Sequence, residues 1–170
     1  MQSIVADAQV LFTEHERGVF RYLCRIVGQP ETARDLTQEV FLRVVRTPVP
    51  DSTDVGRRAW VFRIARNLAL NHLRDGRRRP VVVELAESTR PATQDVSAAL
   101  RQALAALPDV ERDVFLMRET AGLSYDEIAI ACDLSIDAVR SRLHRARQLL
   151  RAALDVPVSL HRQRGVRIGK

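Results

Sequence analysis

The chain has 170 residues, which is enough for one medium-sized domain or two small ones. Hydrophobic residues form 46% of the sequence, an ordinary share for a globular protein that argues against wholesale disorder. The 27 lysine and arginine residues outnumber the 21 acidic ones, and the net charge of +6 favours polyanionic partners without excluding other roles. Alternation typical of strands is scarce and only 7 glycines are present, so we predict an all-α fold of two small helical domains joined by a flexible linker.

No stretch approaches the roughly 20 apolar residues that span a bilayer, and the first residues lack the basic start and apolar run of a signal peptide. We therefore expect a cytoplasmic protein with no membrane insertion. Cys24 and Cys132 lie far apart, and neither belongs to a Cys-x-x-Cys motif. Because both stand next to apolar residues, we interpret them as small core side chains. His144 has no carboxylate or cysteine company in the pattern of a metal site, and we expect no metal and no cofactor.

The first apolar pattern, from Val10 to Val27, predicts one or two packed helices. Gly28 is a good helix stop, and Pro30 suits the first turn of the helix that we expect from Glu31 to Arg46. The apolar residues predicted on the buried side of this second helix are Leu36, Val40, Phe41, Val44 and Val45. The residues predicted on its surface are Asp35, Gln38, Glu39 and Arg43.

Two prolines and a glycine between Thr47 and Gly56 rule out a continuous helix there. A third helix is expected from Arg57 to Asp75, ended by Gly76, with Trp60 as its core anchor. One face of this helix is apolar and carries Val61, Ile64, Ala65 and Leu68. The roughly opposite face is basic and polar and carries Arg63, Arg66, Asn67, Asn71 and Arg74.

The composition changes at residues 80–96, where two prolines and a mixture of polar residues show no helical period. We interpret this stretch as a linker between a domain over residues 1–79 and a second domain over residues 97–154. Leucines at helical spacing lead up to Pro108, and a further helix is expected from Asp109 to Thr120, ended by Gly122. The basic tail over residues 155–170 has little apolar content, and we expect it to be disordered.

A helix-turn-helix pattern closes the second domain. Ser124 and Glu127 form a capping box for a short helix, which breaks at Cys132-Asp133-Leu134. Ser135 can cap the longer helix that follows, up to Leu150. Its predicted buried residues are Ile136, Val139, Leu143, Ala146 and Leu150. A basic and polar front with an apolar back suits a helix seated in a DNA major groove, although an arginine-rich solvated helix has a similar pattern.

Two stretches of the N-terminal half resemble region 2 of the extracytoplasmic-function (ECF) sigma factors of bacterial RNA polymerase. They are Asp35-Leu-Thr-Gln-Glu-Val-Phe-Leu-Arg-Val-Val45 and Ala59-Trp-Val-Phe-Arg-Ile-Ala-Arg-Asn-Leu-Ala-Leu-Asn-His-Leu-Arg74. The chain from Leu107 to Leu150 resembles region 4 of the same family, through residues 107–116, 122–129 and 139–147. Many regulators contain a helix-turn-helix, but the two halves together, in the family's order and spacing, are highly specific.

The resemblance implies a dissociable specificity subunit that is not an enzyme. In this family, region 2 binds the clamp coiled coil of the polymerase core and captures the −10 promoter element as a single strand. Region 4 reads the −35 element as duplex and docks on the polymerase flap. An anti-sigma factor is a common partner in the family and is expected here. The expected partners are therefore the polymerase core, promoter DNA and an anti-sigma factor.

The family's contact positions can be carried onto this sequence. Polymerase contacts fall on Asp35, Gln38, Glu39 and Arg43. Contacts with the −10 strand fall on Arg63, Arg66, Asn67, Asn71 and Arg74, and the loop from Thr47 to Arg58 stands where family members hold a flipped base. Contacts with the −35 duplex fall on Arg140, Ser141, Arg142, His144 and Arg145. For each set, the alternative is an ordinary solvated helix face.

Two other functions compete with this interpretation. A helix-turn-helix regulator that binds duplex DNA without polymerase would leave the region 2 pattern unexplained. An enzyme is the remoter alternative, because the sequence shows no metal-binding cluster, phosphate-cradling glycine loop or nucleophile arrangement.

Overall fold

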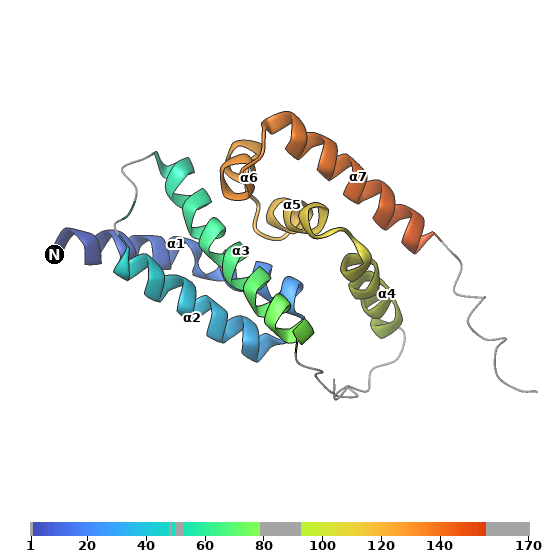
Figure 1. Cartoon of the computed structure of the whole chain (residues 1–170), viewed down its shortest axis with the longest axis horizontal. Coiled ribbons are helices and arrows are strands. Elements are labelled where there is room, and N and C mark those ends of the chain that lie inside the picture. The colour runs from blue at the N-terminus through green and yellow to red at the C-terminus, as the bar shows by residue number, and fades with distance from the viewer. Residues whose placement is uncertain (1, 48, 50–52, 79–92, 156–170) are drawn as a thin grey trace, which may run out of the picture.

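The computed structural model describes residues 2–47, 49, 53–78 and 93–155, with side chains placed for residues 8–47, 49, 53–76 and 98–155. This part of the chain contains seven α-helices and no strand, which confirms the all-α prediction (Figure 1). The N-terminal half comprises α1 (Gln2–Val27), α2 (Pro30–Arg46) and α3 (Asp54–Arg78). The C-terminal half comprises α4 (Thr93–Ala106), α5 (Asp109–Glu119), α6 (Tyr125–Cys132) and α7 (Ile136–Leu154).

The N-terminal half is a three-helix bundle in which each helix packs on the other two. Gly28 ends α1 with a positive φ of 76°, and Pro30 opens α2, both as predicted. The core is built from fully buried residues of all three helices, including Val19, Tyr22, Leu23, Val40, Val44, Val61, Phe62 and Ala65. The edge-to-face contact of the Tyr22 and Phe62 rings, with centroids 5.9 Å apart, joins α1 to α3.

The first helix is a single one, which is one of the two predicted possibilities. Three other details of the N-terminal half differ from the prediction. Helix α3 extends beyond both expected ends, running through Gly76 to Arg78. A glycine inside a helix costs about 1 kcal/mol relative to alanine, which weakens the helix without stopping it. Val45 is 48% exposed, because a bundle of three covers only one side of α2. Trp60 is only partly buried, whereas Phe62 is the aromatic residue of α3 that the core encloses.

The C-terminal half packs α5, α6 and α7 against one another, with α4 lying on α7. The helix-turn-helix prediction is confirmed by its hydrogen bonds. Ser124 Oγ accepts the Glu127 backbone N–H over 3.2 Å, and Glu127 Oε2 accepts the Ser124 N–H over 2.7 Å. Asp133 adopts the left-handed conformation (φ 55°) in the turn, and Ser135 Oγ accepts the Ala138 N–H over 3.1 Å.

One boundary and one burial in this half also differ from the prediction. Helix α4 begins at Thr93, inside the stretch interpreted as linker, and residues 79–92 lie outside the described residues. Ile136, the first residue of α7, is 38% exposed rather than buried. The basic tail beyond Asp155 lies outside the described residues.

The two halves pack directly against each other. Helix α6 lies along α3, and α5 contacts α1, so that α3 stands between α2 and the helix-turn-helix (Figure 1). We call this packing the closed arrangement. It brings the predicted basic face of α3 next to the C-terminal half.

Candidate nucleic-acid and polymerase interfaces

The front of α7 is open to solvent. The side chains of Arg140, Ser141, His144 and Arg145 are all exposed on one side of the helix, while Val139, Leu143, Ala146 and Leu150 are buried on the other. Arg140 forms an ion pair of 3.0 Å with Asp137, one turn earlier on the same helix. The Arg145 guanidinium, in a side chain that is 68% exposed, lies 3.9 Å from Glu111. These residues remain available to a duplex in the closed arrangement.

Arg142 differs from the other residues of the predicted −35 set. Its side chain is 36% exposed, and it donates to Glu111 of α5 over 3.2 Å. Its Nε atom is buried and has no hydrogen-bond partner among the described residues. Glu111 is only 4% exposed and is held by Arg142 and Arg145 together. Arg142 therefore connects α7 to α5, a role that the sequence pattern did not indicate.

The structure divides the predicted −10 set on α3 into two groups. Asn67, Asn71 and Arg74 are exposed. Arg63 donates from its guanidinium to the backbone carbonyl of Ile130 on α6. Arg66 donates from Nε to Asp113 Oδ2 on α5 over 2.7 Å, and its side chain is 18% exposed. Two of the five predicted DNA contacts are therefore engaged by the C-terminal half.

Asp113 is the centre of the buried contact between the halves. The residue is 1% exposed, and its Oδ1 accepts the Tyr22 hydroxyl of α1 over 3.2 Å. Burial raises the pKa of Asp113, an effect that the Arg66 charge and the two hydrogen bonds partly offset. Burial also raises the pKa of Tyr22 well above its usual value, so the phenol stays protonated and donates. Burial by itself lowers the pKa of Arg66, but the Asp113 carboxylate reverses that effect, and the guanidinium stays charged.

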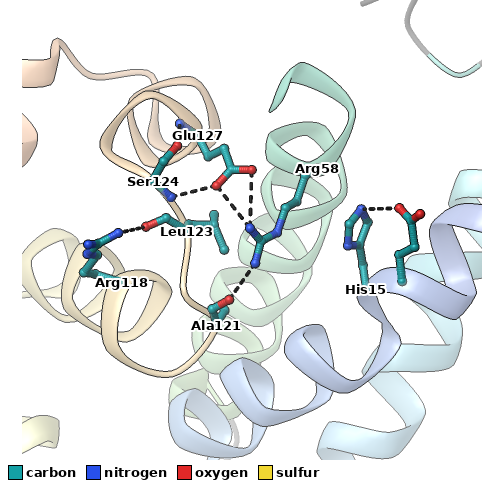
Figure 2. A network of polar contacts seen from close by, with 8 residues as sticks. His15, Arg58, Arg118, Ala121, Leu123, Ser124 and Glu127 are labelled. Carbon is teal, nitrogen blue, oxygen red and sulfur yellow. Dashed lines mark hydrogen bonds and ion pairs between the residues drawn. The ribbon is translucent and has the colours of Figure 1, made fainter. Parts of the chain in front are cut away.

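A second contact between the halves is centred on Arg58 of α3 (Figure 2). Its guanidinium lies 3.3 Å from Glu127 Oε2, the carboxylate oxygen that caps α6, and donates to the Ala121 carbonyl over 2.7 Å. Figure 2 shows His15 of α1 on the other side of Arg58. Burial, followed by the Arg58 charge, lowers the pKa of His15, which therefore stays neutral at neutral pH.

Tyr22, Arg58 and Asp113 were not among the site residues predicted from the sequence. One signal was present for Asp113, which falls on the helical stripe formed by Val110, Val114 and Met117. A carboxylate on an apolar stripe becomes buried with that stripe, and a buried charge needs a hydrogen-bonding or cationic partner. The pattern therefore indicated a cationic residue elsewhere in the chain. Nothing local identified the partner as Arg66.

The predicted polymerase contacts lie on the outer side of α2. Asp35, Gln38 and Arg43 are exposed, Glu39 is half-buried, and Arg43 Nε lies 2.9 Å from Glu39 Oε1. Leu42, on the same side of the helix, is 47% exposed. The set forms a mixed acidic and apolar surface that the C-terminal half does not cover.

Within the described residues, no three histidine, cysteine or acidic side chains are grouped as a metal site would require. Cys132 is buried, as predicted, whereas Cys24 is only partly buried. A helix long and apolar enough to cross a membrane is not found among the described residues.

Comparison with known proteins identifies the family. Residues 11–79 match the family model for sigma-70 region 2, and residues 97–150 match the model for sigma-70 region 4. The chain is 34% identical over 155 residues to the ECF RNA polymerase sigma factor SigL of Mycobacterium tuberculosis, covering 86% of this chain and 88% of SigL. The chain belongs to the ECF sigma factors.

Two further relatives agree with this assignment. The RNA polymerase sigma-H factor of Pseudomonas aeruginosa is 31% identical over 163 residues, covering 85% of this sigma factor and 84% of that one. The ECF sigma factor SigE of Mycolicibacterium smegmatis is 34% identical over 163 residues, covering 88% of this chain. The match spans only 62% of the length of SigE.

Solved structures show the same fold. CnrH, in complex with the cytosolic domain of CnrY, matches this sigma factor with a TM-score of 0.67 and 28% identity, covering 88% of each chain. The sigma factor RpoE of Bartonella quintana, in complex with the anti-sigma factor NepR, matches with a TM-score of 0.69 and 23% identity. It covers 89% of this chain and 98% of that one, and at this identity the likeness concerns the fold alone.

Proposed function

We propose that this chain binds the core of bacterial RNA polymerase in the cytoplasm and directs initiation at promoters with its own −10 and −35 elements. The observation that carries the proposal is the presence of regions 2 and 4, in order, on one chain. A polymerase-independent regulator needs the helix-turn-helix but has no use for region 2. The proposal assigns no catalytic role to the chain itself.

We assign the two DNA contacts to separate surfaces. The exposed front of α7, with Arg140, His144 and Arg145, supplies hydrogen-bond donors that match guanine edges and phosphates in a duplex. The basic face of α3 supplies Arg63, Arg66 and the amides of Asn67 and Asn71 for an unpaired strand. Each contact is modest alone, and tethering both to one polymerase raises the affinity through effective concentration.

We assign polymerase binding to the exposed side of α2 around Asp35, Gln38, Glu39 and Arg43. Exposed acidic groups beside apolar Leu42 suit a partner that offers both cations and a hydrophobic contact. An anti-sigma factor is a common partner in this family, and CnrH, which is 28% identical, is bound to the cytosolic domain of CnrY in its structure, so we also propose such a partner for this chain.

The experiment is transcription by core polymerase on fragmented genomic DNA, with and without this protein, followed by mapping of RNA 5′ ends. We expect start sites that appear only with the protein and share two spaced sequence elements. A protein that binds DNA but neither comigrates with core polymerase nor creates such start sites is instead an independent helix-turn-helix regulator. Nucleotide turnover by the protein alone would point to an enzyme.

A further inference from the structure

We propose that a cavity between α1, α4 and α5 is a binding site for a nucleoside triphosphate, whose phosphates are held by arginines and whose base lies against apolar side chains. We call it the α1–α4 cavity. None of the described residues assigned above to DNA or to polymerase lines it. The site therefore goes beyond the proposed function and does not rest on it.

The α1–α4 cavity has the size of a small-molecule site. Its volume is about 580 Å³, within the usual range for such sites. Its walls come from residues 20–28 at the end of α1, from α4, and from α5 with Thr120, the residue that follows α5. A space of this volume has room for one nucleotide but does not admit a nucleic-acid duplex.

The described lining of the α1–α4 cavity contains four arginines and no acidic residue. The arginines are Arg21, Arg25, Arg101 and Arg112. Arg21 and Arg25 are exposed, stand one helical turn apart on α1, and form no ion pair with a described carboxylate. Like charges at this spacing repel each other and destabilise a helix. A bound anion removes that repulsion, and guanidinium groups match the geometry of phosphate oxygens.

Arg112 offers the cavity a buried hydrogen-bond donor that the protein leaves unused. The residue is 7% exposed, and one terminal nitrogen donates to Asp109 over 2.7 Å. Its Nε atom is buried without a partner, and of the four described arginines with such an atom, Arg112 is the one that lines this cavity. An unpaired buried donor destabilises the fold, and a phosphate oxygen would satisfy it. Because Asp109 and Asp113 offset part of the Arg112 charge, attraction of the ligand depends mainly on Arg21 and Arg25.

The rest of the α1–α4 cavity suits the base and the sugar. Apolar side chains complete the lining: Phe20, Ile26, Val27, Leu104 and Ala105. Phe20 is half-buried, and an aromatic ring can stack on the face of any base. The Thr120 hydroxyl also lines the cavity, makes no hydrogen bond with another described residue, and can donate to a ribose oxygen. An inorganic anion would leave the apolar lining unused, whereas a nucleotide uses both parts.

The first measurement is isothermal titration calorimetry of the full chain with ATP, GTP, CTP and UTP, at about 0.15 M salt and without magnesium. The comparison ligands are the four nucleosides and inorganic triphosphate. We expect one site for at least one nucleotide, with about tenfold higher affinity than for inorganic triphosphate, because the base adds a stacking contact. The nucleosides alone should bind too weakly to detect. The site is overturned if none of the four nucleotides binds, and its assignment to a nucleotide is overturned if inorganic triphosphate binds equally well.

Variants then locate the binding. Arg25→Gln should lower the affinity about tenfold, as for the loss of one charge-assisted hydrogen bond. Ala105→Phe, at an exposed position of α4, keeps every charge but fills the cavity, and should abolish binding. Arg21→Gln provides a further variant if circular dichroism shows that Ala105→Phe does not fold.

The matched control is Arg46→Gln. It removes the same charge at an exposed position in the last turn of α2, and Arg46 does not line the cavity. Binding should be unaltered. If Arg46→Gln weakens binding as much as Arg25→Gln does, the nucleotide is attracted only by the general positive charge of the chain, and the site is overturned.

Cys24, which is partly buried and lines the α1–α4 cavity, reports the place of binding directly. A nucleotide at about ten times its Kd should slow the alkylation of this thiol by iodoacetamide about tenfold, because only the free chain then reacts. Mass spectrometry of the digested chain separates Cys24 from Cys132, whose slower reaction should not change. An unprotected Cys24 in a chain saturated with nucleotide would place the ligand elsewhere. None of these measurements requires polymerase, so failure of the proposed function leaves their outcome unaffected.

Discussion

Arg66 and Asp113, separated by 47 positions in the sequence, meet across the two halves of the molecule with Nε and Oδ2 2.7 Å apart. One partner comes from the basic face that the family resemblance assigns to the −10 strand, and the other from a buried stripe of region 4. Their pairing means that the free chain does not present all its proposed DNA contacts at once.

Arg145→Ala should weaken binding to a −35 duplex by roughly 1–3 kcal/mol, the usual loss when one good side-chain contact to a base is removed. The side chain is 68% exposed and its nearest carboxylate, on Glu111, lies 3.9 Å away, so little stability depends on it. Fluorescence anisotropy with a duplex from a mapped promoter measures the change. Arg34→Ala removes an exposed charge from region 2 and should leave duplex binding unaltered. Unchanged binding and unchanged promoter output for Arg145→Ala would remove this residue from the proposed set.

Asp35→Arg should lower the affinity for core polymerase about tenfold or more. The introduced arginine would repel the cations that we propose on the partner. Binding to the −35 duplex should hardly change, since Asp35 lies on α2, in the other half of the molecule. Comigration with core and duplex anisotropy are measured on the same preparation. Glu14→Arg is the control, a charge reversal on α1 at a side chain that is 61% exposed. Equal damage to both activities would count against the assignment of α2 to polymerase.

Arg142→Ala should lower the free energy of unfolding by about 1–3 kcal/mol, because it removes a charge-assisted hydrogen bond from enclosed Glu111. Arg140→Ala, two positions earlier on the same helix, removes an exposed ion pair with Asp137 and a distant contact with the Tyr125 ring, 6.0 Å from its centroid, and should cost about 1 kcal/mol or less. Urea unfolding followed by circular dichroism compares the two variants. If both variants unfold at the same urea concentration as the wild type, Arg142 is not a structural connection between α7 and α5.

The thiol of Cys132 should react slowly in the native chain. Burial raises its pKa to about 11, and the residue is 8% exposed beside Met117. At about pH 8 its thiolate fraction is roughly a hundredfold below that of an unperturbed thiol, and reactivity should rise with pH towards 11. A disulfide reagent applied to a Cys24→Ala chain isolates this thiol. Asp113→Asn should accelerate the reaction, because it removes a nearby negative charge that raises the pKa of the Cys132 thiol, while Glu119→Gln should not.

The sequence predicted most of the local structure correctly, because local structure depends on residues a few positions apart. The capping box of Ser124 and Glu127 and the cap by Ser135 each join groups within one helical turn, and Asp133 lies in the predicted helix break. Periodicity also separated the buried Val139 and Leu143 from the exposed front of α7. Errors arose at Val45 and Ile136, where an apolar residue stands beyond the surface that neighbouring helices cover.

The sequence by itself determined the helical class, the helix-turn-helix and the family. Each of these follows from short residue patterns or from the order of those patterns along the chain. Only the tertiary structure decided that the halves pack together, and that Arg66 and Arg63 are engaged by region 4. These contacts join residues 47 and 67 positions apart, and the Arg58–Glu127 pair spans 69. The residues around an arginine in the sequence can be the same whether its side chain faces water, a phosphate or a buried carboxylate. Tertiary packing, and not the neighbouring sequence, determines which of these the guanidinium contacts.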